Sequence, residues 1–355
     1  MHRLAREVAL EAAREILRET AEGQAVGGEA PGEAPGGART PQRKGRRDLV
    51  TRVDRRIEAL LAERIAAHCP DDAILGEESI RSSGSSGRVW ILDPVDGTTN
   101  FVHGHPMVGV SVALADGYSG MPQAADLRDD PLASGFFDPA RMPRMLAAAV
   151  SAPFLGEIYW AARGAGAFIE RLPDGAYAPD RGNAPDRANA PDRANVPDRA
   201  RRLRVSGTRR LADALVATGF AYRRNELHNN NLENFRRVAL AARGIRRGGS
   251  AALDLCFVAA GRFDAFWELY LKPWDVAAGL LLVEEAGGRV TDLDGGPRAP
   301  EGVAVVASNG HVHEALWEML ERPDADWVVD EQARLGMNRA PQPDRPSDSN
   351  APAEG

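Results

Sequence analysis

The chain has 355 residues, with 44 Lys and Arg against 51 Asp and Glu, and a formal net charge of −7 at pH 7. A chain of this length can bury a sizeable core, as one large domain or as two lobes. The acidic balance argues against sequence-independent binding of nucleic acid. Two cysteines, Cys69 and Cys256, are too few for a disulfide framework, and no apolar run is long enough for a membrane span. We therefore expect a soluble cytoplasmic protein that binds neither membrane nor nucleic acid.

The first half of the chain begins with helical patterns. An amphipathic helix is predicted over residues 3–21, and a Gly-, Ala-, Pro- and Glu-rich segment over 22–42 predicts a flexible loop. A second helix is predicted from Thr51 to Ala67, with Thr51 as N-cap and Asp54 at the third helical position, which is a capping-box pattern. Further along, apolar runs predict strands at 73–75, 89–92, 108–114 and 263–267, and helical periodicity predicts helices at 232–243, 251–260 and after Asp275 as far as Gly287.

Two low-complexity segments separate or follow these elements. A six-residue Ala-Pro-Asp-Arg-Ala-Asn repeat fills residues 178–199, and its proline content and lack of apolar residues predict a disordered surface insertion. The last residues, from about 335 to 355, have the composition of a disordered tail. The chain is thus expected to divide into an N-terminal α+β lobe at 1–170, an insertion at 171–202, a C-terminal α/β lobe at 203–322 and a mostly disordered tail at 323–355.

One segment, Trp90 to Phe101, combines acids with glycine and threonine at the end of a buried strand. Val89–Leu92 is a continuous apolar run, and Pro94 cannot donate to a strand ladder, so the strand is expected to end there. Asp93, the Val95 carbonyl and Asp96 can then converge, while Gly97-Thr98-Thr99 offers backbone N–H groups to an anion. Hard oxygen ligands beside an anion cradle suit a Mg²⁺-dependent phosphate site. A strand followed by an ordinary Asp-Gly turn is the alternative.

The longer motif resembles the signature of the inositol monophosphatase family, W-I-x-D-P-x-D-G-T-T-N-F. The resemblance covers roughly residues 1–320 apart from two inserted segments, and its further motifs are Lys44–Thr51, Gly76–Ser79, Gly249–Ala252, Phe266–Glu268, Pro273–Asp275 and Glu285–Gly288. It implies an α/β (α+β) fold, the layered αβαβα sandwich of the inositol monophosphatase and fructose-1,6-bisphosphatase type.

The same resemblance assigns roles to the acids. It implies two or three Mg²⁺ ions, with Glu77 as a ligand supported by Glu78, Asp93 bridging two ions, the Val95 carbonyl on the first ion, and Asp96 and Asp275 on the second. Adjacent acids such as Glu77 and Glu78 are more often merely solvated, and Asp275 also sits where a helix N-cap belongs.

The remaining assignments concern the attacking water and the substrate. By resemblance, Asp54 and Thr98 hold and deprotonate the water, with Glu77 also in the catalytic set. The substrate contacts are expected to be Gly97, Thr98, Gly249, Ser250, Ala251, Glu268 and Asp275. Lys44 would face the phosphate or the metal cluster, unless it is an ordinary surface lysine. Asp54 has helix capping as its alternative role, and Glu268 that of an exposed strand acid.

Together with the resemblance, these features predict a Mg²⁺-dependent phosphomonoesterase that uses direct attack of a metal-activated water. The resemblance implies myo-inositol 1-phosphate as the substrate and sensitivity to lithium. Histidinol phosphate, fructose 1,6-bisphosphate and 3′-phosphoadenosine 5′-phosphate are the alternative substrates. The small phosphorylated polyol is the expected partner, together with a second copy of the chain in a homodimer. A non-catalytic alternative is a regulatory protein that binds the transcription machinery, as some bacterial members of the family do.

Overall fold

The computed structural model describes residues 1–26, 42–43, 49–117, 144–171, 200–222, 224–225, 227, 229–293, 296 and 304–320. The expectations for Lys44, for the 178–199 repeat, for the C-terminal tail and for most of the 22–42 loop lie outside these residues. None of the described helices combines the length and the apolar character that crossing a bilayer requires.

Two β-sheets form the framework. The larger sheet has eight strands in the order β10-β9-β8-β7-β6-β5-β3-β4 and the smaller has five in the order β12-β11-β13-β15-β14. The strands of the larger sheet are β3 (Ala73–Gly76), β4 (Arg81–Ser82), β5 (Arg88–Asp96), β6 (Gly109–Asp116), β7 (Arg144–Ala152), β8 (Glu157–Ala162), β9 (Gly166–Arg171) and β10 (Ala200–Arg202). Those of the smaller sheet are β11 (Leu215–Thr218), β12 (Gly244–Arg246), β13 (Ala265–Leu269), β14 (Arg289–Thr291) and β15 (Ala304–Ser308). A separate two-stranded pair joins β1 (Gln42–Arg43) to β2 (Leu49–Val50).

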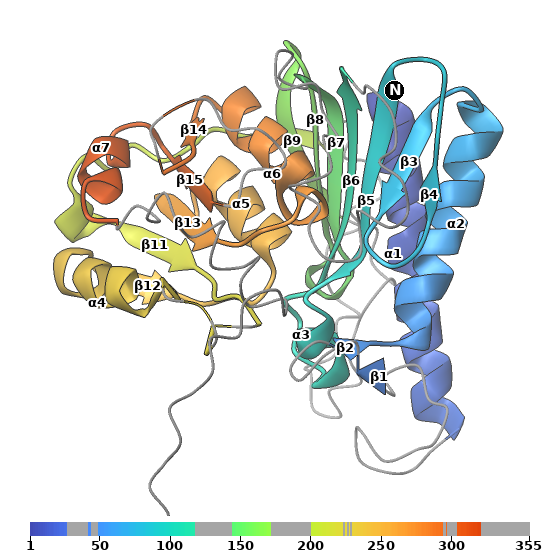
Figure 1. Ribbon diagram of the computed structural model, residues 1–355, viewed down its shortest axis with the longest axis horizontal. Coiled ribbons are helices and arrows are strands. Elements are labelled where there is room, and N and C mark those ends of the chain that lie inside the picture. The colour runs from blue at the N-terminus through green and yellow to red at the C-terminus, as the bar shows by residue number, and fades with distance from the viewer. Residues whose placement is uncertain are drawn as a thin grey trace, which may run out of the picture.

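Helices complete five layers (Figure 1). The outer face of the larger sheet carries α1 (His2–Val26) and α2 (Arg52–His68), while α5 (Ala251–Ala259) and α6 (Pro273–Glu285) lie between the two sheets. The smaller sheet is covered on its far side by α4 (Leu232–Ala241) and α7 (His313–Trp317), and the short α3 (Thr98–Val102) follows β5. Three clusters of buried apolar side chains fill the four spaces between these layers, because one cluster surrounds the central helices and contacts both sheets. The predicted αβαβα sandwich is confirmed.

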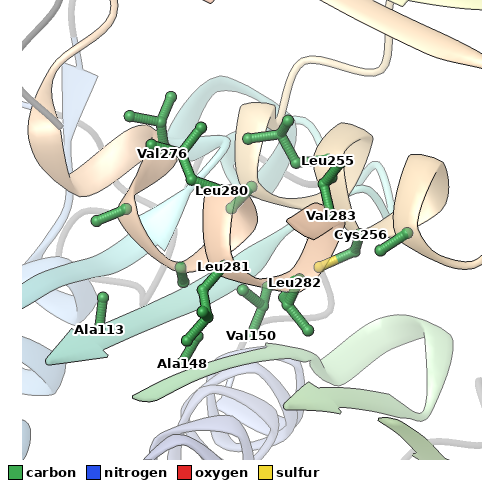
Figure 2. Packing of buried hydrophobic residues seen from close by; sticks show 14 of the residues in the cluster. Ala113, Ala148, Val150, Leu255, Cys256, Val276, Leu280, Leu281, Leu282 and Val283 are labelled. Atoms are coloured by element: carbon green, nitrogen blue, oxygen red, sulfur yellow. The ribbon is translucent and has the colours of Figure 1, made fainter. Parts of the chain in front are cut away.

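The central helical layer is almost wholly apolar because both of its faces are covered by sheets. Figure 2 shows Leu255 and Cys256 of α5 close to the apolar side chains of α6, with Ala148 and Val150 of β7 on the side of the larger sheet. The two helices pack so closely that a Cβ atom added at Gly279 would lie 2.4 Å from Cδ1 of Leu255. This contact fixes the position of α6, whose first turn carries Asp275.

Several predicted boundaries differ from those observed. The first helix extends to Val26, five residues into the expected loop, and β5 runs through Pro94 to Asp96 because pairing with β6 resumes after an irregularity between Asp93 and Asp96. The helix expected after Asp275 begins at Pro273, since proline is well suited to the first helical position. The strand expected at 263–267 occupies Ala265–Leu269.

The segments that flank the repeat pair with each other as a hairpin. Strands β9 and β10 pair antiparallel, with Glu170 opposite Ala200 and Phe168 opposite Arg202. The Leu203 N–H also donates to the Ala167 carbonyl at 2.8 Å. The chain therefore leaves the larger sheet at Arg171 and re-enters it directly beside that point, at its edge.

Candidate functional site

The site is built around an irregularity at the end of β5. Asp93 pairs with Ser111 of β6, the register then shifts, and pairing resumes between Asp96 and Gly109. The Val95 N–H donates to Oδ1 of Asp93 at 2.9 Å, which closes the irregular turn around the proline. Both carboxylates remain almost inaccessible, with Asp93 2% and Asp96 8% exposed. A strand that continues past Pro94 thus holds two buried acids three residues apart.

Parallel pairing between β3 and β5 brings Glu77 to the same place. Gly76 lies opposite Leu92, and the Glu77 N–H donates to the Leu92 carbonyl at 3.1 Å. Glu77 is therefore the neighbour of Asp93 across the sheet. Burial raises the pKa of Asp93 well above its ordinary value, and the negative charges of Glu77, Asp96 and Asp275 raise it further. Four of the acids that the sequence singled out therefore lie within electrostatic reach of one another.

Asp96 connects β5 with the central helical layer. Its Oδ2 accepts hydrogen bonds from Ser250 Oγ at 2.6 Å and from the Ala252 N–H at 2.8 Å, at the beginning of α5. Burial raises the pKa of Asp96 to about 6, although the bonds from Ser250, Ala252 and Ala251 oppose the shift. The Ser250 hydroxyl, which was expected to contact the substrate, instead donates a hydrogen bond to Asp96.

Asp275 occupies the third position of α6, and Lys272 is the N-cap residue. The expectation that Asp275 sits at the N-cap was wrong, because Pro273 starts the helix two residues earlier. Asp275 nevertheless caps this helix, since its Oδ2 accepts from the Lys272 N–H at 2.7 Å. The helix start is also tied to the larger sheet by Ser111 Oγ, which donates to the Trp274 carbonyl at 3.2 Å.

Asp54 and Thr98 come together from α2 and α3. Thr98 Oγ lies 3.0 Å from Asp54 Oδ1 and 3.1 Å from the Val95 carbonyl oxygen. The other Asp54 oxygen accepts from the backbone N–H of Thr51 at 2.9 Å and from its hydroxyl, which is the predicted capping box. Asp54 is completely buried, and burial raises its pKa while the bonds from Thr51 and Thr98 oppose the shift. Capping and contact with Thr98 thus use different oxygens of one carboxylate.

The far wall of the site comes from the smaller sheet and from the turn before α5. Glu268 lies near the end of β13, and a Cβ atom added at Gly219 would lie 2.1 Å from its carboxylate oxygens. Burial raises the pKa of Glu268, and the charges of Asp275 and Asp254 raise it further. Gly249 adopts a φ of +85°, which favours glycine, directly before the N-cap residue Ser250.

Three residues of the site were missed from the sequence. Asn100 donates through Nδ2 to the carbonyls of Met107 at 2.7 Å and Gly248 at 2.9 Å, which joins the β5–α3 segment to the turn before α5. Ser111 anchors Trp274, as described above, and Asp254 is a buried acid of α5 whose pKa is raised well above its ordinary value by burial and by the charge of Asp96. Only Asn100 had a sequence signal, as part of the motif around Asp93.

The acids around Asp93 supply only oxygen, and this donor set fits Mg²⁺ better than softer metals. Within the described ranges, no three His, Cys, Asp or Glu side chains already have the arrangement of a metal site. Oxygens of Asp93, Asp96 and Asp275 accept protein hydrogen bonds instead. Since all of these donors are oxygen atoms, the chemistry of the site fits Mg²⁺. Lys44 lies outside the described residues, and Glu78 is placed by its N–H, which donates to Glu58 at 2.7 Å.

Comparison with known proteins gives concordant results. The family model described as "Inositol monophosphatase family" matches residues 1–127 and 140–323. An inositol-1-monophosphatase from Rhizobium meliloti is 37% identical over 281 residues, which are 79% of this chain and 85% of that protein. The Nus factor SuhB of Pseudomonas aeruginosa is 38% identical over 78% of this chain and 84% of its own length.

Among solved structures, the inositol monophosphatase from Anabaena (Nostoc) aligns with a TM-score of 0.64 and 30% identity, covering 92% of this chain and 98% of that one. The extragenic suppressor protein SuhB from Bartonella henselae aligns with a TM-score of 0.64 and 32% identity, covering 89% of this chain and 96% of that one. Both alignments therefore cover about nine-tenths of this chain.

Proposed function

Since this chain belongs to the inositol monophosphatase family and is a phosphatase, we propose that it hydrolyses inositol monophosphate, with myo-inositol 1-phosphate as substrate, in a Mg²⁺-dependent reaction. The observation that carries the proposal is the convergence of Glu77, Asp96 and Asp275 on the buried Asp93. Carboxylates packed this closely destabilise one another unless they take up a proton or hold a cation.

Glu77, Asp93, the Val95 carbonyl, Asp96 and Asp275 would hold the Mg²⁺ ions. When bound, Mg²⁺ would neutralise phosphate charge and lower the pKa of water. The fold sets the orientation of these carboxylates: a strand irregularity orients Asp93, the start of α5 orients Asp96, and a capping bond orients Asp275. Glu78 would support Glu77 from the same turn, and Lys44 would complete the charge balance near the phosphate.

Asp54 and Thr98 would position the attacking water and accept its proton. With its hydroxyl proton directed to Asp54, Thr98 Oγ presents lone pairs to a water beside the phosphorus. A carboxylate whose pKa is raised by burial is a stronger base than an exposed aspartate, and this suits general-base work near neutral pH. Attack in line with the leaving oxygen would give inositol and phosphate directly.

The substrate would lie between the two halves of the site. Gly97 and Thr98 would contact the phosphate, and Gly249, Ser250 and Ala251 would face the ring through their backbone. Glu268, at the far wall, would accept hydrogen bonds from ring hydroxyls, and Asp275 would lie between the ring and the metals. Histidinol phosphate, fructose 1,6-bisphosphate and 3′-phosphoadenosine 5′-phosphate remain the competing substrates. We further propose a homodimer in the cytoplasm and inhibition by lithium.

The proposal is tested by measuring phosphate release from these four substrates across a Mg²⁺ titration. The variant Asp96→Asn should abolish turnover while the protein stays folded. Asp264→Asn is the matched control, because Asp264 also accepts from a serine hydroxyl, Ser206 Oγ at 2.6 Å, and from a backbone N–H, that of Leu215 at 2.7 Å. The control should keep its kcat. A kcat of Asp96→Asn close to that of the parent, or full activity in EDTA, would refute the metal assignment.

A second function is favoured by the 38% identity to a protein named Nus factor SuhB. The chain would then also assemble with transcription machinery, independently of hydrolysis. A pull-down with the inactive Asp96→Asn protein separates the two roles: recovery of RNA polymerase by both parent and variant supports the second function, and recovery by neither refutes it.

A further inference from the structure

Glu58 is a buried acid with an unusual set of partners. It lies on α2 one helical turn after Asp54 and is completely inaccessible to solvent. Its Oε1 accepts from the Glu78 N–H at 2.7 Å, and its Oε2 accepts from the N–H groups of Ser79 at 3.0 Å and Ile80 at 3.1 Å. Ser79 Oγ lies 3.4 Å from the same Oε2. A single carboxylate therefore receives three consecutive backbone N–H groups.

Consecutive N–H groups that converge form a nest, a backbone shape that binds anions. Here the protein itself supplies the anion, and the turn between β3 and β4 wraps around it. The Gly76 N–H closes this turn by donating to the Ile80 carbonyl at 2.8 Å. These three N–H groups point at a completely buried carboxylate, and leaving them without that acceptor would be costly, so the conformation of the turn depends on Glu58.

The Glu58 carboxylate occupies the space that a side chain at position 76 would need, so this position requires glycine. A Cβ atom added at Gly76 would lie 2.1 Å from Oε1 of Glu58 and 2.7 Å from its Cδ, so a side chain there would displace the acid. Gly76 pairs with Leu92, the residue before Asp93, and Glu77 follows as the first residue of the turn. The nest therefore begins one residue after Glu77, at the point where Glu77 and Asp93 lie next to each other.

We infer that Glu58 is a positioning residue for the metal site: it holds the turn 77–80 so that the Glu77 carboxylate faces Asp93. This inference rests on the proposed function. Because Asp54 and Glu58 stand one turn apart on α2, a single helix positions both Thr98 and Glu77. Glu58 itself touches neither substrate nor metal and acts only through the backbone of the turn.

The test compares Glu58→Gln with the parent enzyme. Glutamine preserves the size of the side chain but replaces one acceptor oxygen by an NH₂ group that faces N–H donors. The Mg²⁺ concentration for half-maximal activity should rise roughly tenfold to a hundredfold, as for other residues that support metal ligands, while kcat at saturating Mg²⁺ stays within about threefold. Calorimetric titration of the substrate-free protein with Mg²⁺ should show the same weakening without relying on activity.

Glu19→Gln is the control for loosening of α2. Glu19 on α1 is 3% exposed and pairs with Arg52 of α2 at 3.0 Å and with Arg56 of α2 at 2.5 Å, so it ties α1 to the same part of α2 that carries Glu58. It should lower the melting temperature without changing Mg²⁺ affinity. If Glu58→Gln fails to fold, Gly76→Ala displaces the same carboxylate while keeping its charge, and it should weaken Mg²⁺ binding in the same direction.

The outcomes separate the inference from the proposed function. A Glu58→Gln or Gly76→Ala protein that folds and binds Mg²⁺ like the parent would overturn the positioning role and leave the proposed function standing. A parent protein that neither binds nor requires Mg²⁺ would overturn both.

Discussion

Thr98 has one hydroxyl proton and two acceptors for it. Asp54 Oδ1 and the Val95 carbonyl lie at nearly equal distances from its Oγ, and the second Asp54 oxygen is already occupied by Thr51. The proton can therefore be redirected from one acceptor to the other without any movement of the Thr98 oxygen. In either orientation the lone pairs of the Thr98 oxygen can accept a hydrogen bond from a third group while the oxygen stays in place.

Replacing Thr98 by valine removes this hydroxyl and keeps the shape of the side chain. We expect Thr98→Val to lower kcat by about a hundredfold or more, the usual effect of losing a group that assists proton transfer. KM should change much less. Thr98→Ser should retain most of the activity, because it keeps the oxygen. Steady-state kinetics with circular dichroism as a folding check make the comparison, and a valine variant with parental kcat would exclude Thr98 from proton transfer.

We expect the stability of the protein to depend on pH through His313, a residue that lies away from the site. It is 1% exposed, and its ring nitrogens lie 3.0 Å from Thr291 Oγ and 2.9 Å from Ser308 Oγ. Burial and the charge of Arg289 lower the pKa of His313 from 6.5 to about 4. Below pH 6.5 the His313 side chain becomes protonated in the unfolded chain, but in the folded protein it becomes protonated only near pH 4. The free energy of unfolding therefore falls as the pH falls through this range.

The gap between these pKa values corresponds to about 3 kcal/mol. Urea unfolding at pH 7.5, 5.5 and 4.5 should show this loss in the parent. His313→Gln should be less stable at pH 7.5 and should lose less stability on acidification. A parent and a variant whose curves run parallel across this range would show that His313 does not titrate as expected.

At the scale of elements, the position of α6 depends on its contact with α5. Gly279 faces Leu255 at a distance that leaves no room for a methyl group, since an added Cβ atom would lie 2.6 Å from the Leu255 Cβ as well. Any separation of the two helices would also shift the first turn of α6, where Asp275 and Trp274 lie.

Gly279→Ala is therefore expected to destabilise the protein by about 1 to 3 kcal/mol, the usual effect of overpacking a core. In an ordinary exposed helix the same substitution stabilises by roughly 0.5 to 1 kcal/mol, so the sign of the effect is the test. Thermal or urea unfolding measures it, and a variant more stable than the parent would show that α5 and α6 can separate at no cost.

The elements that the sequence predicted well are those with an unambiguous periodicity. The continuous apolar run at Val89–Leu92 and the capping box at Thr51 each have one reasonable interpretation, and the structure agrees. Strand β7, by contrast, contains three consecutive alanines, Ala147–Ala149, which favour a helix in isolation. It becomes a strand only because it lies between β6 and β8 in the covered centre of a sheet.

The residues of the site likewise fall into those that the sequence identified and those that it missed. The acids were identified because they stand in a distinctive motif, and Asp93 and Glu77 end up side by side through strand pairing. The groups that hold them were missed, since Asn100, Ser111 and Glu58 find their partners through the fold rather than through neighbours in the chain. Long-range hydrogen bonds leave no periodic signal in a sequence.

At the scale of the whole molecule, the larger sheet is joined to the central helical layer where the site lies. Asp96 reaches Ser250, Asn100 reaches the Gly248 carbonyl, and Ser111 reaches the Trp274 carbonyl. The inserted repeat, in contrast, departs from the far edge of the larger sheet, between β9 and β10.

Replacing residues 178–199 by a short Gly-containing turn should leave kcat/KM unchanged. The β9–β10 pairing does not require the repeat, and a shorter loop should raise stability by about 1 kcal/mol or less. Kinetics, thermal unfolding and size-exclusion chromatography test this together. Loss of activity, or conversion of a dimer to a monomer, would show that the repeat contacts the site or a second subunit.

The bonds that join the larger sheet to the central helices also lead us to expect a particular order of events when the chain refolds. Neither sheet carries all the acids of the site. Asp93 and Asp96 lie in the larger sheet and Glu268 in the smaller one, while Asp275 lies on a helix between them. Each sheet can bury its tryptophan, Trp90 or Trp267, before the two have met. Fluorescence would then recover first and catalysis last, so regained activity would report the docking of two finished halves rather than the folding of either one.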